Sequence, residues 1–127
     1  MKKLLTLTVI LYSLMFSTVS FGEWTEVGEN LEGNTLYIDF ERIRTHNDYR
    51  YVWTLLDNLE PTEFGILSTK VYRQVDCKES KTKYLQYVFY KQPMGEGSGE
   101  SVTGNGDWIY PPPYGEDVLL ISGLCEK

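Results

Sequence analysis

The sequence predicts a small α+β domain rich in β-strand, with a twisted antiparallel sheet of about five to six strands and a short C-terminal helix tied on by a disulfide. Apolar and polar residues alternate in runs bounded by Gly, Pro, Asn and Asp, which is typical of half-buried strands. Residues 116–125 begin with two acids and show helical spacing instead. Cys77 and Cys125 form an even pair in an exported domain, which favours one disulfide.

The N-terminus has the pattern of a bacterial export signal. Two lysines precede an apolar run over residues 4–16, and the small residues Ser20 and Gly22 form a typical signal-peptidase site. The run is short for a membrane span, which needs about 20 residues. We therefore expect residues 1–22 to be a cleaved signal peptide and residues 23–127 to form a single domain without a membrane span. Its destination would be the periplasm, the outer-membrane surface or the medium.

The mature chain is acidic. Cleavage removes two lysines and no acid, which leaves ten basic and eighteen acidic residues and moves the formal net charge from −6 to −8. This charge argues against nucleic acid and anionic membrane surfaces as partners. The small basic run Lys78, Lys81 and Lys83 is expected to be a solvated strand edge or turn.

The pattern assigns the elements in chain order. Expected strands are residues 23–28, 35–39, 49–59, 66–77 and 83–92. Residues 40–44 lose the alternation and are expected to make one helical turn. His46, Asn47 and Asp48 then read as a turn that leads into a hairpin.

Alternation also predicts which side chains share a face of a strand. In the fourth strand, an inward face is expected for Leu67, Val71, Val75 and Cys77. In the fifth strand, one face is expected to carry Leu85, Tyr87 and Phe89, and the other Tyr84, Val88 and Tyr90.

The C-terminal third changes character. Residues 93–107 are rich in glycine and offer little to bury, so we expect an exposed loop, and the prolines at 111–113 require an extended chain. Residues 116–125 fit a helix, with one face expected to carry Val118, Leu119, Ser122 and Cys125. A final strand is the alternative, because branched residues and Gly123 favour it.

No residue pattern indicates catalysis or a metal centre. His46, the single histidine, lies in a turn-like run with no nucleophile or zinc-binding motif nearby. The glycines of residues 95–99 lack the strand-to-helix context of a phosphate-binding loop. No spacing singles out a catalytic carboxylate pair. We therefore expect a protein that is not an enzyme.

The aromatic content is the unusual feature. Aromatic residues occupy both faces of residues 49–55 and 84–90, which is more than a one-sided core needs. Either the second face is covered by the C-terminal helix or the long loop, or it is exposed and binds a protein, a second copy or a flat ligand. The candidate binding surface consists of Tyr49, Tyr51, Trp53, Tyr84 and Tyr90.

In order and spacing, several segments of the chain together resemble the bacterial surface-adhesin protein E family. These segments are Trp24-Thr25-Glu26-Val27-Gly28, Leu36-Tyr37-Ile38-Asp39, Ile43, Val52-Trp53, Asp76-Cys77 and Cys125. The chain departs from the family in its Gly-rich loop, its three consecutive prolines and its lack of a lipid-anchor cysteine. No binding motif stands at a matching position, so the family's ligand-binding residues are not carried over.

The resemblance implies a small exported domain with a sheet, a disulfide-tied helix, adhesion to host matrix proteins, homodimer formation and haem binding. The expected function is thus a non-enzymatic envelope or cell-surface binding module. The alternative is a periplasmic domain that binds a small haem-like ligand. No cofactor is predicted from the residues themselves. His46, a methionine or a tyrosine would have to ligate a haem iron.

Overall fold

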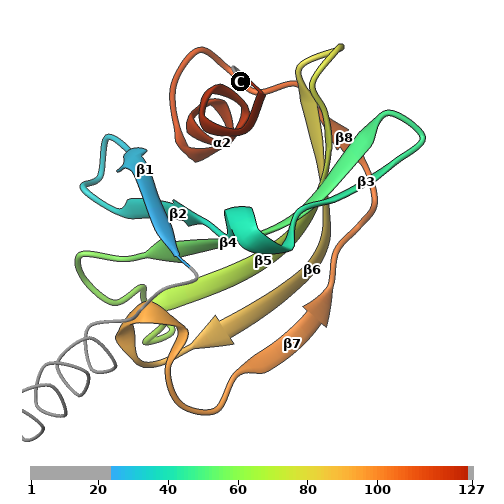
Figure 1. The fold of residues 1–127 in the computed structure, drawn as a ribbon. Coiled ribbons are helices and arrows are strands. Elements are labelled where there is room, and N and C mark those ends of the chain that lie inside the picture. The colour runs from blue at the N-terminus through green and yellow to red at the C-terminus, as the bar shows by residue number, and fades with distance from the viewer. Residues whose placement is uncertain (1–23, 126–127) are drawn as a thin grey trace, which may run out of the picture.

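Eight strands among residues 24–125 form one antiparallel sheet that curves around a single helix, as the computed structural model in Figure 1 shows. The predicted signal peptide, residues 1–22, lies outside the described residues. The strands are β1 (Thr25–Glu29), β2 (Thr35–Ile38), β3 (Arg44–His46), β4 (Tyr49–Asp57), β5 (Ser68–Asp76), β6 (Lys81–Tyr90), β7 (Glu100–Thr103) and β8 (Trp108–Ile109). The helical elements are the 3-10 turns η1 (Phe40–Arg42) and η2 (Pro93–Gly95) and the helix α2 (Glu116–Cys125). The predicted fold class and the C-terminal helix are confirmed.

The sheet is built around the three long strands β4, β5 and β6, in the order β1-β2-β4-β5-β6-β7. β2 and β3 pair with two halves of the same edge of β4, and β7 and β8 do the same on β6. The sequence pattern missed β3, β7 and β8, which have two to four residues each. β7 lies inside the segment expected to be a loop. It is fully exposed, so it forms through backbone pairing with β6 and carries no apolar alternation.

The turn predicted at residues 46–48 is one residue shorter, because His46 is the last residue of β3. Asn47 and Asp48 have φ values of 50° and 69°, the left-handed conformation that a two-residue hairpin loop between β3 and β4 requires. The helical turn expected at residues 40–44 is η1. Its N-cap is Asp39, whose Oδ1 accepts a hydrogen bond from the backbone N–H of Glu41 at 3.2 Å.

The core lies between α2 and the sheet. Its fully buried members are Leu36, Ile38, Val52, Val75, Leu120 and Leu124. A Cβ at Gly123 would lie 3.1 Å from Val27 Cγ1, so the missing side chain lets the helix approach β1 closely. The predicted helix face was only partly right. Leu119 and Cys125 pack against the core, but Ser122 is exposed, and the buried residues that face the sheet are Leu120 and Leu124, one turn apart.

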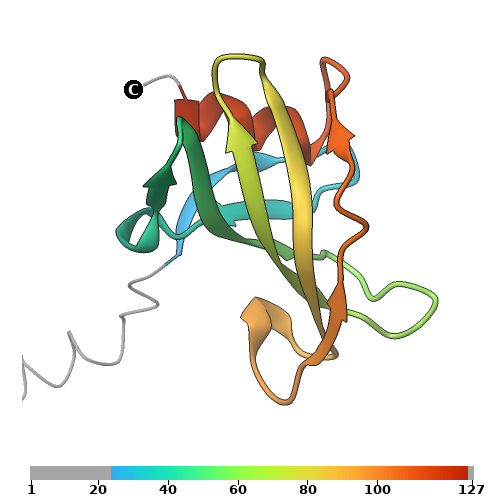
Figure 2. The same cartoon turned by 90° about the vertical axis from the view of Figure 1, so that its right-hand side faces the viewer.

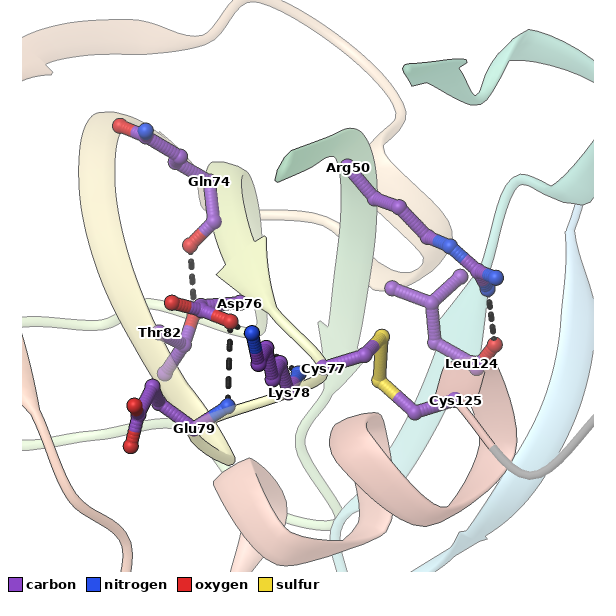
Figure 3. The surroundings of a disulfide bond; sticks show 9 residues. All are labelled: Arg50, Gln74, Asp76, Cys77, Lys78, Glu79, Thr82, Leu124 and Cys125. Atoms are coloured by element: carbon purple, nitrogen blue, oxygen red, sulfur yellow. Dashed lines mark hydrogen bonds between the residues drawn. A yellow bond between two sulfur atoms is a disulfide. The ribbon is translucent and has the colours of Figure 1, made fainter. Parts of the chain in front are cut away.

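A disulfide ties the end of α2 to the end of β5, as predicted. Cys77 directly follows β5 and bonds to Cys125, the last residue of α2 (Figure 3). Beside it, Arg50 Nη1 donates a hydrogen bond to the Leu124 carbonyl oxygen at 2.6 Å. This bond satisfies a helix-end carbonyl that has no partner within the helix and places a positive charge at the negative end of the helix dipole.

A bulge in β6 corrects the predicted faces of that strand. Tyr72 pairs with Gln86 and Arg73 pairs with Tyr84, so Leu85 is an extra residue. The extra residue reverses the alternation, and Tyr84 therefore shares its face with Tyr87, the ring centroids being 5.5 Å apart. The sequence pattern had placed Tyr84 with Val88 and Tyr90, on the opposite face.

The disulfide yields a stability prediction. The 48-residue separation corresponds to roughly 4 kcal/mol of lost unfolded-chain entropy in the loop model. We expect the double variant Cys77→Ser, Cys125→Ser to lose up to about that free energy of unfolding in urea denaturation. Intact mass before and after reduction and alkylation gives the direct test. Two thiols that are freely alkylated in unreduced exported protein would contradict the pairing.

Candidate functional site

The sheet has one covered face and one open face. Val52 packs against the helix-side core, so alternation along β4 turns Tyr49, Tyr51 and Trp53 to the other side. We call the side of β4, β5 and β6 that is turned away from α2 the open face. Figure 2 looks onto these three strands, with α2 passing behind them. The open face is therefore the side of these strands that the helix leaves uncovered.

A first hollow of about 440 Å³ lies on the open face. Its lining comes from four strands and consists of Arg44, Thr45, His46, Tyr51, Tyr72 and Leu85. The rings of Tyr51 and Tyr72 have centroids 6.3 Å apart, and the lining surface is mostly apolar. The bulge in β6 explains the presence of Leu85 here.

A second hollow of about 300 Å³ neighbours the first. It is lined by Trp24, Arg42, Trp53, Lys70, Val88 and Tyr90. Trp53 lines this hollow and lies 5.0 Å from the ring of Tyr72, which lines the first, so an aromatic pair separates the two. Neither lining contains a carboxylate.

Cationic side chains gather on the same face, over aromatic rings. Lys81 Nζ and Lys83 Nζ lie 4.6 and 4.4 Å from the ring centroid of Trp108, and Lys70 Nζ lies 5.2 Å from that of Tyr90. Lys78 is in the β5–β6 turn as predicted. Lys81 and Lys83, in contrast, are half-buried members of β6 rather than a solvated turn.

A buried ionic cluster lies on the opposite, helix-covered face. Arg73 is fully buried, and its Nη1 donates to Asp117 Oδ1 at 2.5 Å, while Tyr84 Oη donates to the same oxygen. Arg73 Nε donates to Thr54 Oγ1 at 3.0 Å. Arg73 Nη2 has no hydrogen-bond partner within residues 24–125 and lies 3.7 Å from Glu116 Oε2.

The cluster shifts the pKa values of its members. Burial raises the pKa of Tyr84, although Arg73 opposes this, so the phenol stays protonated and donates to Asp117. Burial also raises the pKa of Glu116, more than the nearby Arg73 lowers it. Burial lowers the pKa of Arg73, but Tyr84, Glu116 and Asp117 outweigh that effect and raise it overall.

The structure divides the predicted binding residues between two faces. Tyr49, Tyr51 and Trp53 lie together on the open face as half-buried side chains, and Tyr90 is buried at the edge of the second hollow. Tyr84 belongs to the ionic cluster under α2. For Tyr84, the structure therefore agrees with the alternative that the C-terminal helix covers one aromatic face of the sheet.

Sequence reasoning missed Arg73, Asp117 and Tyr72. Arg73 stands at an inward position between Val71 and Val75, and this break in an apolar stripe was the available signal. Asp117 was read only as a favourable charge in the first turn of the helix. The pairing of two residues 44 positions apart depends on how α2 docks.

The comparison with protein-family models decides the relationship. Residues 24–125 match the family described as surface-adhesin protein E. The chain belongs to the surface-adhesin protein E family. Membership in a family of surface adhesins identifies it as an exported or surface-exposed protein and points to a non-enzymatic role.

Solved structures of the family share the fold. Crystal form II of Haemophilus influenzae protein E superposes with a TM-score of 0.62 at 14% identity, over 82% of this chain and 87% of that one. Protein E from non-typeable Haemophilus influenzae superposes with a TM-score of 0.54 at 15% identity, over 82% of this chain and 76% of that one. A search of curated proteins finds no match.

The described part of the chain holds neither a metal-binding cluster nor a membrane-spanning helix. Within residues 24–125, no group of three or more His, Cys, Asp or Glu side chains is placed to hold a metal ion. The ten residues of α2 fall far short of the roughly 20 that a membrane-spanning helix needs, and the same part of the chain contains no other candidate span.

The ionic cluster yields a matched pair of variants. Asp117→Asn leaves the buried guanidinium of Arg73 without its hydrogen-bonded counter-charge, so we expect a loss of about 3 to 5 kcal/mol of unfolding free energy. Glu116→Gln removes the acid next to Asp117. Because folding raises the pKa of Glu116, ionised Glu116 destabilises the folded wild type. This variant should match or exceed wild-type stability at pH 7.

The pH dependence has a definite sign. A raised folded-state pKa of Glu116 means that its protonated form favours folding, so the advantage of Glu116→Gln should shrink as pH falls through that pKa. Urea denaturation at several pH values measures both effects. If Asp117→Asn and Glu116→Gln lower the free energy of unfolding equally at pH 7, the two acids contribute equally to stabilising Arg73 and the prediction is wrong.

Proposed function

We propose that this chain is an exported, non-enzymatic adhesin that binds proteins at the bacterial surface through its open face. Residues 1–22 direct export, and residues 23–127 form the single binding domain. Family membership supports the adhesin role. The observation that carries the choice of surface is that Tyr49, Tyr51, Trp53 and Tyr72 lie on a face that α2 leaves uncovered.

The composition of this face suits protein recognition. Tyr, Trp and Arg are the residues enriched in the centres of protein interfaces, where rigid rings provide contact area at little entropic cost. The two hollows are of a size that accepts side chains of a partner. The covered face has no such role, because its aromatic residues support the buried ion pair.

A haem-like ligand is the second candidate. The observation in its favour is that His46, Tyr51 and Tyr72 line one hollow with a mostly apolar wall, which suits the face of a flat ring. The residues provide one exposed imidazole, that of His46 at the end of β3, hydrogen-bonded to Asn47, as a nitrogen ligand. We therefore expect any haem binding to be weak.

Adhesion is tested with two tyrosine variants. Binding of the exported protein to immobilised extracellular-matrix glycoproteins is measured by surface plasmon resonance. Tyr51→Ser should weaken binding by at least about 2 kcal/mol, roughly thirtyfold, because it removes an interface ring. It should cost the fold only about 1 kcal/mol, since the ring is half-buried.

The matched control is Tyr84→Ser on the covered face. It should lower the free energy of unfolding by about 3 kcal/mol or more while the folded fraction keeps its affinity. Light scattering of each variant shows whether the open face instead joins two copies of the chain. Unchanged binding and unchanged association in Tyr51→Ser would contradict the proposed surface.

Haem binding is tested by titrating the protein with haemin and following the absorption spectrum. His46→Ala should keep whatever haemin-induced absorption the wild type shows, because a single exposed histidine does not form a tight site. If the wild type forms a tight haemin complex and His46→Ala loses it, the first hollow is a haem-binding site that depends on His46, and this prediction is wrong.

A further inference from the structure

We propose that the partner bound by the open face is an acidic protein segment that also carries apolar side chains. This inference rests on the protein-binding function proposed above and specifies the chemistry of the partner. It follows from three observations: the unpaired cations on the open face, the mostly apolar lining of the first hollow, and the lysines that lie over aromatic rings.

The open face carries several cations although the protein is acidic overall. Among residues 24–125, four of these cations make no ion pair with a carboxylate, namely Arg44, Lys70, Lys81 and Lys83, whereas Arg42 at the second hollow pairs with the buried Asp39. A further hollow of about 650 Å³ is lined by Glu32, Glu60 and Glu116 among other residues. Surface charges act over roughly 8 Å at physiological salt, so a partner on the open face meets the local cations rather than the net charge.

The apolar lining decides which kind of anion fits. The first hollow presents Tyr51, Tyr72 and Leu85, and filling it requires apolar side chains. A protein segment supplies such side chains together with carboxylates. A sulfated polysaccharide supplies the anionic groups but leaves the hollow unfilled, and the same is true of a phosphate backbone.

The lysines of the open face lie over aromatic rings, which restricts their positions. Lys81 and Lys83 share the ring of Trp108, which in turn lies 5.6 Å from the ring of Tyr49. Arg44 lies on β3 at the rim of the first hollow. Carboxylates of a bound segment would meet positive groups whose positions are already restricted, which reduces the entropic cost of binding.

A peptide selection tests the proposal. The exported protein is used to select binders from a random 12-residue peptide library displayed on phage. The double variant Arg44→Glu, Lys83→Glu and the control double variant Lys78→Glu, Lys91→Glu are used in parallel. The control makes the same change of charge at two exposed positions outside the hollows. Thermal unfolding verifies that every variant is folded.

The expected result is enrichment of peptides with acidic residues next to aliphatic or aromatic ones. For a synthetic selected peptide, Arg44→Glu, Lys83→Glu should weaken binding by at least about tenfold, equivalent to about 1.4 kcal/mol, and added salt should weaken wild-type binding. The control pair should change affinity by less than about twofold, because rim charges far from the contact contribute little.

Several outcomes overturn the inference. Selected peptides without acidic enrichment, or equal losses in both double variants, would show that the open-face cations do not choose the partner. Heparin or single-stranded RNA that binds more tightly than the peptides, with the same dependence on Arg44 and Lys83, would identify a different polyanion. If matrix proteins bind and the Arg44, Lys83 variant binds them as well as wild type, the acidic-partner inference fails while the proposed adhesin function stands.

Discussion

The docking of α2 on one face of the sheet is the constraint on which the rest of the molecule depends. Three kinds of contact hold the helix: the disulfide to Cys77 at its C-terminal end, the buried Leu120 and Leu124 along its length, and the ion pair of Asp117 with Arg73 at its N-terminal end. A small domain buries a limited apolar core, so fixing both ends of its single helix matters for stability. Because this helix covers one face, the other remains open.

The buried arginine links the energetics of the fold to its chemistry. Arg73 stands between Val71 and Val75 on the covered side of β5. Its buried charge is acceptable because Asp117 and Thr54 accept its hydrogen bonds, and its guanidinium carbon lies 4.4 Å from the ring centroid of Tyr84. The acidic first turn of α2 therefore does more than favour the helix dipole. It places the counter-charge over β5 and sets where the helix begins on the sheet. Replacing the pair by apolar residues would remove this positional requirement.

The aromatic residues are divided between the two faces of the sheet. Tyr84 and Tyr87 lie on the covered face, whereas Tyr51, Trp53 and Tyr72 form the wall between two hollows on the open face. A solved structure of protein E at 14% identity shares the fold. Such divergence is possible because the fold needs a helix-sized apolar layer on one face only, which leaves the residues of the open face less constrained by packing.

The sequence by itself determined the long strands, the two-residue turn at Asn47 and Asp48, the acidic start of the terminal helix and the disulfide. Each of these follows from local periodicity, turn chemistry or cysteine pairing in an exported chain. Only the tertiary structure decided the short edge strands, the bulge that moves Tyr84 to the covered face, and the ion pair of Arg73 with Asp117. Edge pairing and bulges leave no alternation to detect, and the ion pair joins residues 44 positions apart. The first hollow combines side chains from β3, β4, β5 and β6, so it exists only once their register is set.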